Sequence, residues 1–306
     1  MPSAYLVLFV ANLVFATSYS VTRIVLADVA PATLGLARSV IGAALLLPWA
    51  AVHLRGPGSG LRIPPAAIPR WSIGDHVRVG LMGIVGFAMA FGFGNWGIAH
   101  STASNAALLI TVEPTSLLLL SPLLLGDRLS RREAIGATIA VVGTAIVVVN
   151  GIPGLTLSLV PHWRGDLLLI LSGVAYAAYT LLGRGVLTRH AVSVVTAWSM
   201  VWGTAAMIPL AWLEWRVGLV PRWTPSALAG TLYLGIVITA LGYAVWNWCL
   251  DRLGASRVAV FVNVQPLAGA LIGVWWLGEP LTIFTMVGGL LILAGVHLTV
   301  KAGRTE

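Results

Sequence analysis

Charged side chains are scarce in this sequence, and cysteine is almost absent. Only 9% of its 306 residues are charged, whereas 58% are hydrophobic, and soluble domains carry about 25% charged residues. A surface exposed to water on all sides is therefore excluded. The single cysteine, Cys249, excludes an internal disulfide and a cysteine-based metal site. No Walker A loop is present, so ATP is not expected as the direct energy source, and no cofactor is expected.

Acidic residues are almost missing from the interior of the apolar runs. No two of them lie close enough inside a run to hold a metal ion, so no metal site is predicted. The net charge of +8 does not indicate a nucleic-acid partner, because the arginines sit in short connectors and form no basic cluster that alternates with aromatic residues.

Long apolar runs fill the rest of the chain. At roughly 20 apolar residues per crossing, the chain has room for about ten membrane-spanning helices. Breaking it at clusters of charge, proline and glycine places the spans near 4–26, 32–52, 77–99, 102–125, 131–149, 164–187, 192–214, 225–250, 254–277 and 282–300. The first run has no basic n-region and no small-residue cleavage site, so we expect it to be retained as a span.

Lysine and arginine collect on one side of the predicted spans. The connectors on the side of both termini hold thirteen of these eighteen residues, the opposite connectors hold four, and Arg38 lies inside the second run. Cytoplasmic loops keep the positive residues. The bias predicts a multi-pass protein of the cell inner membrane with both termini in the cytoplasm.

The second half of the chain repeats the first. A constant offset of 152 aligns the last three predicted spans of each half, and an offset of 160 aligns the first span of each. Identities at the shorter offset are Asn95 with Asn247, Trp96 with Trp248, Ala103 with Ala255, Ser104 with Ser256, Pro114 with Pro266, Gly126 with Gly278, Leu129 with Leu281, Gly136 with Gly288 and Gly143 with Gly295. The repeat predicts two units of five spans, 1–150 and 151–306.

An odd number of spans per unit turns the second unit upside down relative to the first. The charges agree, because "GDRLSRRE" at 126–133 carries three arginines and "GEPLTIFT" at 278–285 carries none. Inverted repeats around a site at the membrane midplane are a recurring transporter architecture. The predicted fold is therefore an all-α integral membrane protein with ten transmembrane helices in two inverted five-helix repeats.

The segments that follow Pro114 and Pro266, "LLLGDRLSRREAIGATIAVVGTAIVV" and "WWLGEPLTIFTMVGGLLILAGVHL", resemble the EamA repeat of the drug/metabolite transporter superfamily. The likeness covers nearly the whole chain, and its strongest part is the Pro–(Gly-acidic-x-Leu)–Gly–Gly spacing. This resemblance implies an exporter or exchanger of small metabolites with a central cavity between the halves. Among the branches of the superfamily, the chain is most similar to the aromatic amino acid exporters.

Glu113 is the one acidic residue near the centre of a predicted span. On a continuous helix it would share a stripe with Asn105, Leu109 and Ser116. Ionisable groups inside a membrane usually face a watery path, and burial favours the protonated form of a carboxylic acid. Glu113 is therefore a candidate proton carrier. The alternative is a structural hydrogen bond to a neighbouring helix, which Gln265 at the repeat position favours because glutamine has no proton to exchange.

Two prolines and a set of polar and aromatic residues are predicted to line the path. Pro114 and Pro266 each remove a helix hydrogen bond, so each kinks its span at the cavity or only shapes its packing. The first span aligns Asn12, Phe15, Tyr19 and Thr22 on one stripe. Such residues suit a neutral or aromatic solute, although aromatic residues near span ends are also ordinary interfacial anchors. The predicted lining residues are Asn12, Tyr19, Asn95, Trp96, Asn105, Tyr176, Tyr179, Tyr243, Trp246, Asn247, Asn263 and Gln265.

Arg38, about seven residues into the second predicted span, has two interpretations. It contacts a carboxylate of the substrate, or it serves no substrate and its side chain snorkels to the nearby interface or makes a structural bond. The fifth and tenth spans instead carry small residues, which let helices approach closely. We expect these two spans to act as scaffold, and a dimer through them stays open beside a monomer. The expected partners are a small-molecule substrate and membrane lipid.

A metabolite exporter that works by alternating access accounts for the repeat, the charge inversion and the resemblance together. An intramembrane enzyme is the rival class, but none of the six histidines lies at the centre of a span, and no catalytic residue is predicted. A channel would need rings of charge or filter loops, which are missing. Aromatic or other neutral amino acids are the first expectation for the substrate, and nucleosides or drug-like compounds are the alternatives. The sequence leaves proton coupling and facilitated transport both open.

Overall fold

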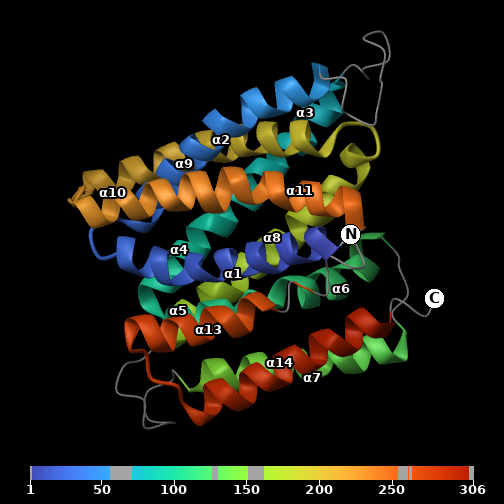
Figure 1. Cartoon of the computed structure of the whole chain (residues 1–306), viewed down its shortest axis with the longest axis vertical. Coiled ribbons are helices and arrows are strands. Elements are labelled where there is room, and N and C mark those ends of the chain that lie inside the picture. Colours follow the sequence, from blue (N-terminus) through green and yellow to red (C-terminus); the bar gives the residue numbers. More distant parts are fainter. Residues whose placement is uncertain are drawn as a thin grey trace.

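The described part of the chain is a bundle of helices (Figure 1). The computed structural model describes residues 2–55, 71–125, 130–150, 162–253, 261 and 264–302. Eight helical segments in these ranges are long and apolar enough to cross a membrane, judged by length and composition. Two shorter apolar helices, Val264–Leu277 and Ile283–Thr299, occupy the positions of the last two predicted spans. The total of ten spans stays a prediction.

The described helices follow one another along the chain. The first part of the chain forms α1 (Pro2–Val25), α2 (Pro31–Arg55), α3 (Ile73–Gly83), η2 (Ile84–Met89), α4 (Ala90–His100), α5 (Ala103–Leu109), α6 (Val112–Leu125) and α7 (Arg131–Val149). The second part forms α8 (Trp163–Leu187), α9 (Val192–Arg216), α10 (Pro225–Leu232), η3 (Tyr233–Leu241), α11 (Gly242–Leu253), α13 (Val264–Leu277) and α14 (Ile283–Ala302).

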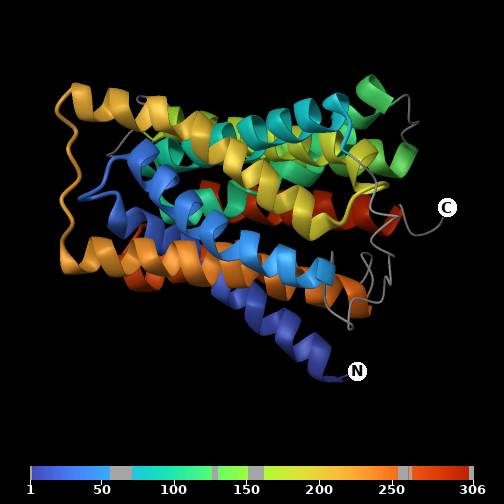
Figure 2. The ribbon, with the colours of Figure 1, turned by 90° about the horizontal axis from the view of Figure 1, so that it is seen from above.

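The two ends of the bundle are distinguished by the chain termini. Helix α1 begins and α14 ends at the same end, as Figures 1 and 2 agree. We call this the terminus end, and we call the opposite end, where the turn 26–30 joins α1 to α2, the far end. The arrangement agrees with the prediction that both termini lie on one side. Which side of a membrane this is remains a prediction.

The predicted span 102–125 is not one continuous helix. It breaks at Ile110 and Thr111 into α5 and α6, because Pro114 has no N–H to donate to the Ile110 carbonyl. That carbonyl instead accepts a hydrogen bond from the backbone N–H of Glu113 at 3.0 Å. Helix α13 also begins two residues before its proline, Pro266. The predicted stripe that joined Asn105 to Glu113 is therefore wrong, since the break separates the two residues.

Two π-helical segments interrupt the spans at related places. The segment η2 separates α3 from α4, and η3 separates α10 from α11. A π segment widens the helix and turns the residues that follow it, and such segments are frequent at functional sites. Phe91 and Asn95 follow η2, and Tyr243 and Trp246 follow η3.

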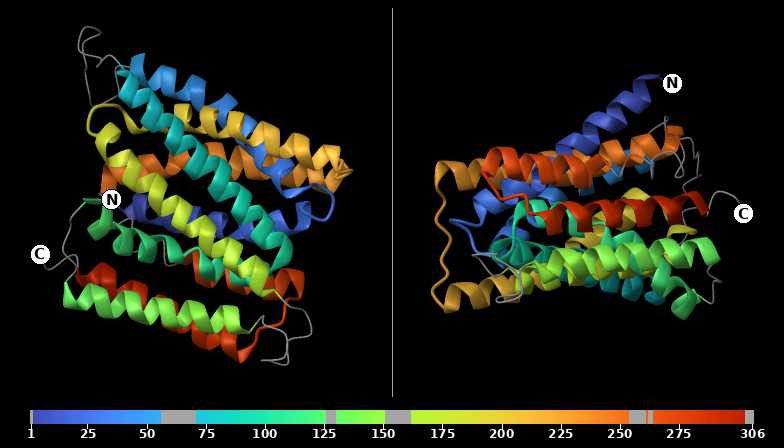
Figure 3. Two further views of the ribbon diagram at one scale, coloured as in Figure 1. Left: turned by 180° about the vertical axis from the view of Figure 1, so that it is seen from behind. Right: turned by 90° about the horizontal axis from the view of Figure 1, so that it is seen from below.

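Helices α7 and α14 lie side by side along one edge of the bundle (Figures 1 and 3). Their contact is built on facing glycines, because a Cβ added at Gly143 would lie 2.6 Å from the Gly288 carbonyl oxygen. At the other end of the contact, a Cβ at Gly295 would lie 2.5 Å from the Gly136 carbonyl oxygen. The small residues predicted to form scaffold thus join these two helices within one chain. A dimer through them stays a prediction.

Candidate functional site

A cavity of about 570 Å³ lies between helices from both parts of the chain. Its walls come from α1, α2, α4, α5, α6 and α8, and from η3, α11, α13 and α14. Eleven of the residues predicted from the sequence line it: Tyr19, Arg38, Asn95, Glu113, Pro114, Tyr176, Tyr179, Tyr243, Trp246, Gln265 and Pro266. The structure therefore brings together residues that are more than 240 positions apart in the sequence. Their roles toward a ligand stay predictions.

The residues that line the cavity differ in exposure along the bundle. Near the far end, 2% of Thr22 and 3% of Asn95 are exposed. Phe15 and Trp246 are partly exposed, and Thr180, which lies nearer the terminus end, is exposed. The far-end lining residues are thus less exposed than these three.

Glu113 and Gln265, which occupy equivalent positions in the repeat, differ in their contacts. The Nε2 of Gln265 donates a hydrogen bond to Oδ1 of Asn12 at 2.8 Å, and Asn12 donates to the Leu8 carbonyl at 2.7 Å. The Glu113 carboxylate lines the same cavity without a hydrogen-bond partner among the described residues. The structural hydrogen bond considered for Glu113 is therefore made by Gln265 and not by Glu113. The glutamate is left available to a proton or a ligand.

Arg38 lies in the cavity wall and does not extend toward the end of its helix. Its guanidinium carbon lies 4.3 Å from the centre of the Phe91 ring, and its Nη2 lies 3.3 Å from Oγ1 of Thr239. Its Nε is buried without a hydrogen-bond partner. Snorkelling to the interface is wrong, because Thr239 and Phe91 hold the side chain at the cavity. The structural bond that the sequence also allowed is present, and the contact with a substrate carboxylate stays a prediction.

Aromatic rings form one wall of the cavity beside Arg38. Phe91 contacts Tyr176 with ring centres 6.2 Å apart, and Phe87 contacts Tyr179 at 5.6 Å and Tyr243 at 6.2 Å. Tyr176 and Tyr243 line the same cavity as both charged side chains, Arg38 and Glu113. The cavity thus combines apolar ring surface, several hydroxyl groups, one cation and one carboxyl group. Such a lining binds a small, partly apolar solute in a fixed orientation.

Some residues predicted to line the cavity lie elsewhere. Asn12 shares a stripe with Phe15 and Tyr19, but its side chain is buried and bonded to Leu8 and Gln265. Trp96 packs against a cluster of buried apolar residues and does not line the cavity. Asn263 lies outside the described residues, as does the side chain of Asn247.

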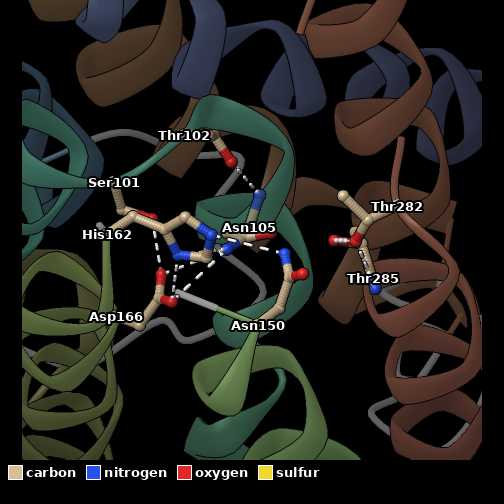
Figure 4. A network of polar contacts seen from close by, with 8 residues as sticks. All are labelled: Ser101, Thr102, Asn105, Asn150, His162, Asp166, Thr282 and Thr285. Atoms are coloured by element: carbon tan, nitrogen blue, oxygen red, sulfur yellow. Dashed lines mark hydrogen bonds and ion pairs between the residues drawn. The ribbon is translucent and has the colours of Figure 1, made fainter. Parts of the chain in front are cut away.

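Asn105, also predicted to line the cavity, belongs to a buried polar network at the far end (Figure 4). Its Nδ2 donates to Oδ1 of Asp166 at 3.2 Å, and Nδ1 of His162 lies 2.7 Å from Oδ2 of Asp166. The Ser101 hydroxyl donates to the same carboxylate, and the Asn150 amide lies 3.4 Å from Nε2 of His162. The network joins the start of α8 to α5. No group of three His, Cys, Asp or Glu side chains that could hold a metal ion occurs in the described ranges.

Glu214, at the end of α9, binds the first turn of α2 at the far end. Its carboxylate accepts the backbone N–H groups of Ala32 and Thr33 at 2.8 Å each, and the Thr33 hydroxyl at 3.0 Å. The indole N–H of Trp215 donates to the same hydroxyl at 2.9 Å. The first N–H groups of a helix lack partners within the helix, so this carboxylate satisfies them and matches the positive end of the helix dipole.

Glu279, in the turn before α14, binds the first turn of α5 in the same way. Its carboxylate accepts the backbone N–H groups of Ala103 and Ser104 at 2.7 and 2.8 Å, and the Ser104 hydroxyl at 2.6 Å. Both glutamates belong to the second half of the chain, and both hold helices of the first half. These contacts could not be predicted from the sequence, because the partners of each carboxylate are distant in the chain.

Several residues that line the cavity were missed from the sequence. Four of them lie four residues before a lining residue on the same helix face: Ser18 before Thr22, Phe91 before Asn95, Ser172 before Tyr176 and Thr239 before Tyr243. Residues at this spacing are neighbours on a helix surface. Extending each predicted polar or aromatic position by one helical turn would have found them.

Comparisons with known proteins agree with this architecture. The profile of the EamA-like transporter family matches residues 2–149 and 163–301. An "uncharacterized transporter" of Archaeoglobus fulgidus is 27% identical over 96% of each chain. A "probable terminal-alkyne amino-acid exporter" of Streptantibioticus cattleyicolor is 28% identical over 76% of each chain, and a "probable amino-acid metabolite efflux pump" of Salmonella typhimurium is 23% identical over 81% of this chain and 86% of the relative.

A solved crystal structure superposes with a TM-score of 0.63, covers 99% of this chain and 97% of the other, and is 21% identical. At that identity the likeness shows the fold alone. The family profile matches nearly the whole chain in two copies, and the relatives that have functional names are transporters. The chain is a multi-pass membrane transporter that belongs to the EamA-like transporter family.

Proposed function

We propose that this protein exports small metabolites across the inner membrane by alternating access, with aromatic or other neutral amino acids as its substrates. The observation that carries the proposal is the cavity, which is lined by residues from both halves of the chain and whose lining residues Thr22 and Asn95 near the far end are buried. With the termini in the cytoplasm, as the distribution of lysine and arginine predicts, this burial favours a state that is open to the cytoplasm.

Helix packing supports two inverted halves around this cavity. Helix α1, the first of its half, packs against α13, and α8, the first of the other half, packs against α6. Helix α2 likewise packs against η3, and α9 packs against α3. Helices at equivalent places in the two halves thus exchange partners, as a twofold relation between the halves requires. Rocking of such halves about a midplane site is a recurring means of alternating access.

Amino acids fit the lining and the names of the relatives. The rings of Phe15, Phe91 and Trp246 offer apolar contact to a side chain, and tyrosine hydroxyls offer hydrogen bonds that fix its orientation. Two relatives are named as exporters of amino acids or of their metabolites. The lining alone suits an amino acid or a nucleoside, and the names of the relatives favour the amino acid.

We further propose that Glu113 couples transport to protons. A carboxyl group inside a membrane span usually has a function. Glu113 lines the cavity, and its side chain has no hydrogen-bond partner among the described residues. Three lining tyrosines lie near it, and Gln265 makes the structural contact in the other half. A proton taken up by Glu113 on one side of the membrane is released when the cavity opens to the other side.

The experiment is uptake of labelled phenylalanine into proteoliposomes, with and without a pH gradient. Saturable uptake by the wild-type protein is expected, and a gradient should accelerate it. The Glu113→Gln variant should keep uptake but lose the response to the gradient. Glu133→Gln is the matched control, because Glu133 caps α7 outside the cavity; it should respond as the wild type does.

Each part of the proposal can fail separately. Absence of phenylalanine uptake by a folded protein would reject the amino acid assignment, and nucleosides would be tested next. Uptake that ignores the gradient in both wild type and Glu113→Gln would reject proton coupling and leave facilitated transport.

A further inference from the structure

Arg38 occupies an unusual place for a cation in a transmembrane helix. It lies in the wall of the cavity and connects the two parts of the chain, because it extends from α2 to Thr239 on η3. Phe91, on α4, covers one face of its guanidinium group. The side chain is therefore held at a fixed position from two sides.

The hydrogen bonds of Arg38 are mostly unused. The Thr239 hydroxyl donates its own proton to the Leu234 carbonyl at 2.8 Å, so it accepts from Arg38 Nη2 and fixes that nitrogen. A guanidinium group has five N–H donors, and among the described residues this is the one hydrogen bond that Arg38 makes. Its Nε is buried and unpartnered. Four donors are thus unused on a group held in place by protein.

No described carboxylate balances the charge of Arg38. The ion pairs in the described ranges involve Asp75 and Asp166, and none involves Arg38. Glu113 lines the same cavity but lies beyond salt-bridge distance. A partly buried cation without a counter-ion is costly, and a group this costly inside a membrane usually serves function. The charge of Arg38 is therefore available to an anionic group that enters the cavity.

We propose that Arg38 is the binding site for a carboxylate group of the transported molecule. Arginine matches a carboxylate with two parallel N–H···O bonds, formed either by Nε and Nη2 or by Nη1 and Nη2. Thr239 takes only one of the two N–H groups of Nη2, so one of these two pairs remains free. Thr239 and Phe91 are positioning residues that hold the guanidinium group for this contact. The inference rests on the proposed transport function but not on a particular amino acid. It requires a carboxylate, which nucleosides and simple amines lack.

The test compares acids with their amides. Purified protein in detergent is titrated with phenylalanine, phenylalanine amide, 3-phenylpropionate and phenethylamine, and affinity is read from thermal stabilisation. A second set pairs other carboxylic acids with their amides. Each acid should bind at least about tenfold more tightly than its amide, the effect of one charge-assisted contact. The two amines without a carboxylate should bind weakly.

Variants locate the preference. Arg38→Gln should remove the preference for acids, and Arg38→Lys should keep part of it, since lysine supplies the charge without the two-pronged geometry. Thr239→Val should weaken the preference severalfold while the charge stays in place, which an arginine with a merely structural role would not show. Arg216→Gln is the control for loss of one positive charge, because Arg216 lies over Trp212 at the far end, outside the cavity.

The outcomes separate this inference from the proposed function. Stabilisation by some other acid but not by its amide, with no phenylalanine transport, would keep the carboxylate site and reject the amino acid assignment. Equal binding of acids and amides by the wild type would overturn the site, whether or not phenylalanine is transported. A preference that survives in folded Arg38→Gln would overturn it as well. If Arg38→Gln does not fold, the Thr239→Val result decides.

Discussion

The far end and the terminus end of the bundle differ in what holds the helices together. At the far end, carboxylates reach from one helix to the next: Glu214 to α2, Glu279 to α5, Asp166 to Ser101 and Asn105, and Asp28 to the Thr224 hydroxyl. Arg23 adds hydrogen bonds to the carbonyls of Ile98 and Ala99 at 2.7 and 2.8 Å. These contacts close the cavity on that side.

At the terminus end, the described contacts of this kind are fewer. Asp75 at the start of α3 accepts from Arg189 at 2.6 Å and lies 3.4 Å from Nε2 of His190, both in the turn after α8. Glu133 caps the start of its own helix through Ser130 and joins no other element among the described residues. The two ends of the bundle therefore differ in how many polar contacts join their helices. The described polar contacts between halves are more numerous at the far end, where the lining residues Thr22 and Asn95 are also buried.

The largest expected effect is a loss of stability when a buried contact at the far end is removed. Asp166 is fully buried and paired with His162, so Asp166→Asn should cost about 3 kcal/mol, the usual loss when one partner of a buried pair is removed. Thermal unfolding in detergent measures it. Asp75→Asn at the terminus end is the control and should cost less, because its partner Arg189 is 51% exposed. Equal losses would contradict the difference between the ends.

Accessibility should differ between the ends by about a hundredfold. Single cysteines are placed at Thr22 and at Thr180 in a Cys249→Ala background, and alkylation by a small polar reagent is timed. Thr22 is buried near the far end and Thr180 is exposed near the terminus end, so labelling at position 22 must await a local opening that costs about 3 kcal/mol. Comparable rates at both positions would show that the far end is not sealed.

The sequence predicted the bundle better than it predicted the site. Apolar runs bounded by clusters of charge, proline and glycine predicted helices close to those observed, because this signal is local. The predicted stripe from Asn105 to Glu113 was wrong because it assumed a continuous helix. Pro114 leaves the Ile110 carbonyl without its helical partner and so allows a break there. The break at Ile110 and Thr111 turns Asn105 to the far-end network and Glu113 to the cavity.

Contacts between the halves could not be predicted from one sequence. Glu279 and Ser104 are 175 positions apart, and nothing in the local pattern relates a carboxylate at one span end to the first turn of a distant helix. The same holds for Arg38. The contact that excludes snorkelling is with Thr239, 201 positions away in the sequence. The sequence shows the type of each residue and its position within an apolar run. It does not show which distant residue each side chain contacts.

A smaller effect should follow from weakening one seal of the far end. Glu279→Gln keeps the shape of the side chain but replaces one of its two acceptor oxygens with an NH2 group, which cannot accept from α5. The loss of this acceptor and of the charge should weaken the contact by at least about 1 kcal/mol. Alkylation of a cysteine at position 22 should become severalfold to tenfold faster. The matched control is Glu133→Gln, which weakens a capping contact of the same chemistry within α7. An equal acceleration in the control would mean that general destabilisation, not the seal, governs access.

The smallest effect is expected from the ion pair at the terminus end. Arg189 is half exposed, and exposed ion pairs contribute about 0–1 kcal/mol. Arg189→Gln should therefore lower the free energy of unfolding by about 0.5 kcal/mol, because Asp75 keeps its hydrogen bonds from the N–H and hydroxyl of Ser72. Thermal unfolding beside Asp166→Asn gives the contrast directly. A loss as large as that of Asp166→Asn would mean that the terminus end is held as firmly as the far end, and that the cavity opens there for reasons other than weak contacts. A small loss, with rapid labelling at position 180 in both proteins, would place the control of access in the carboxylates of the far end.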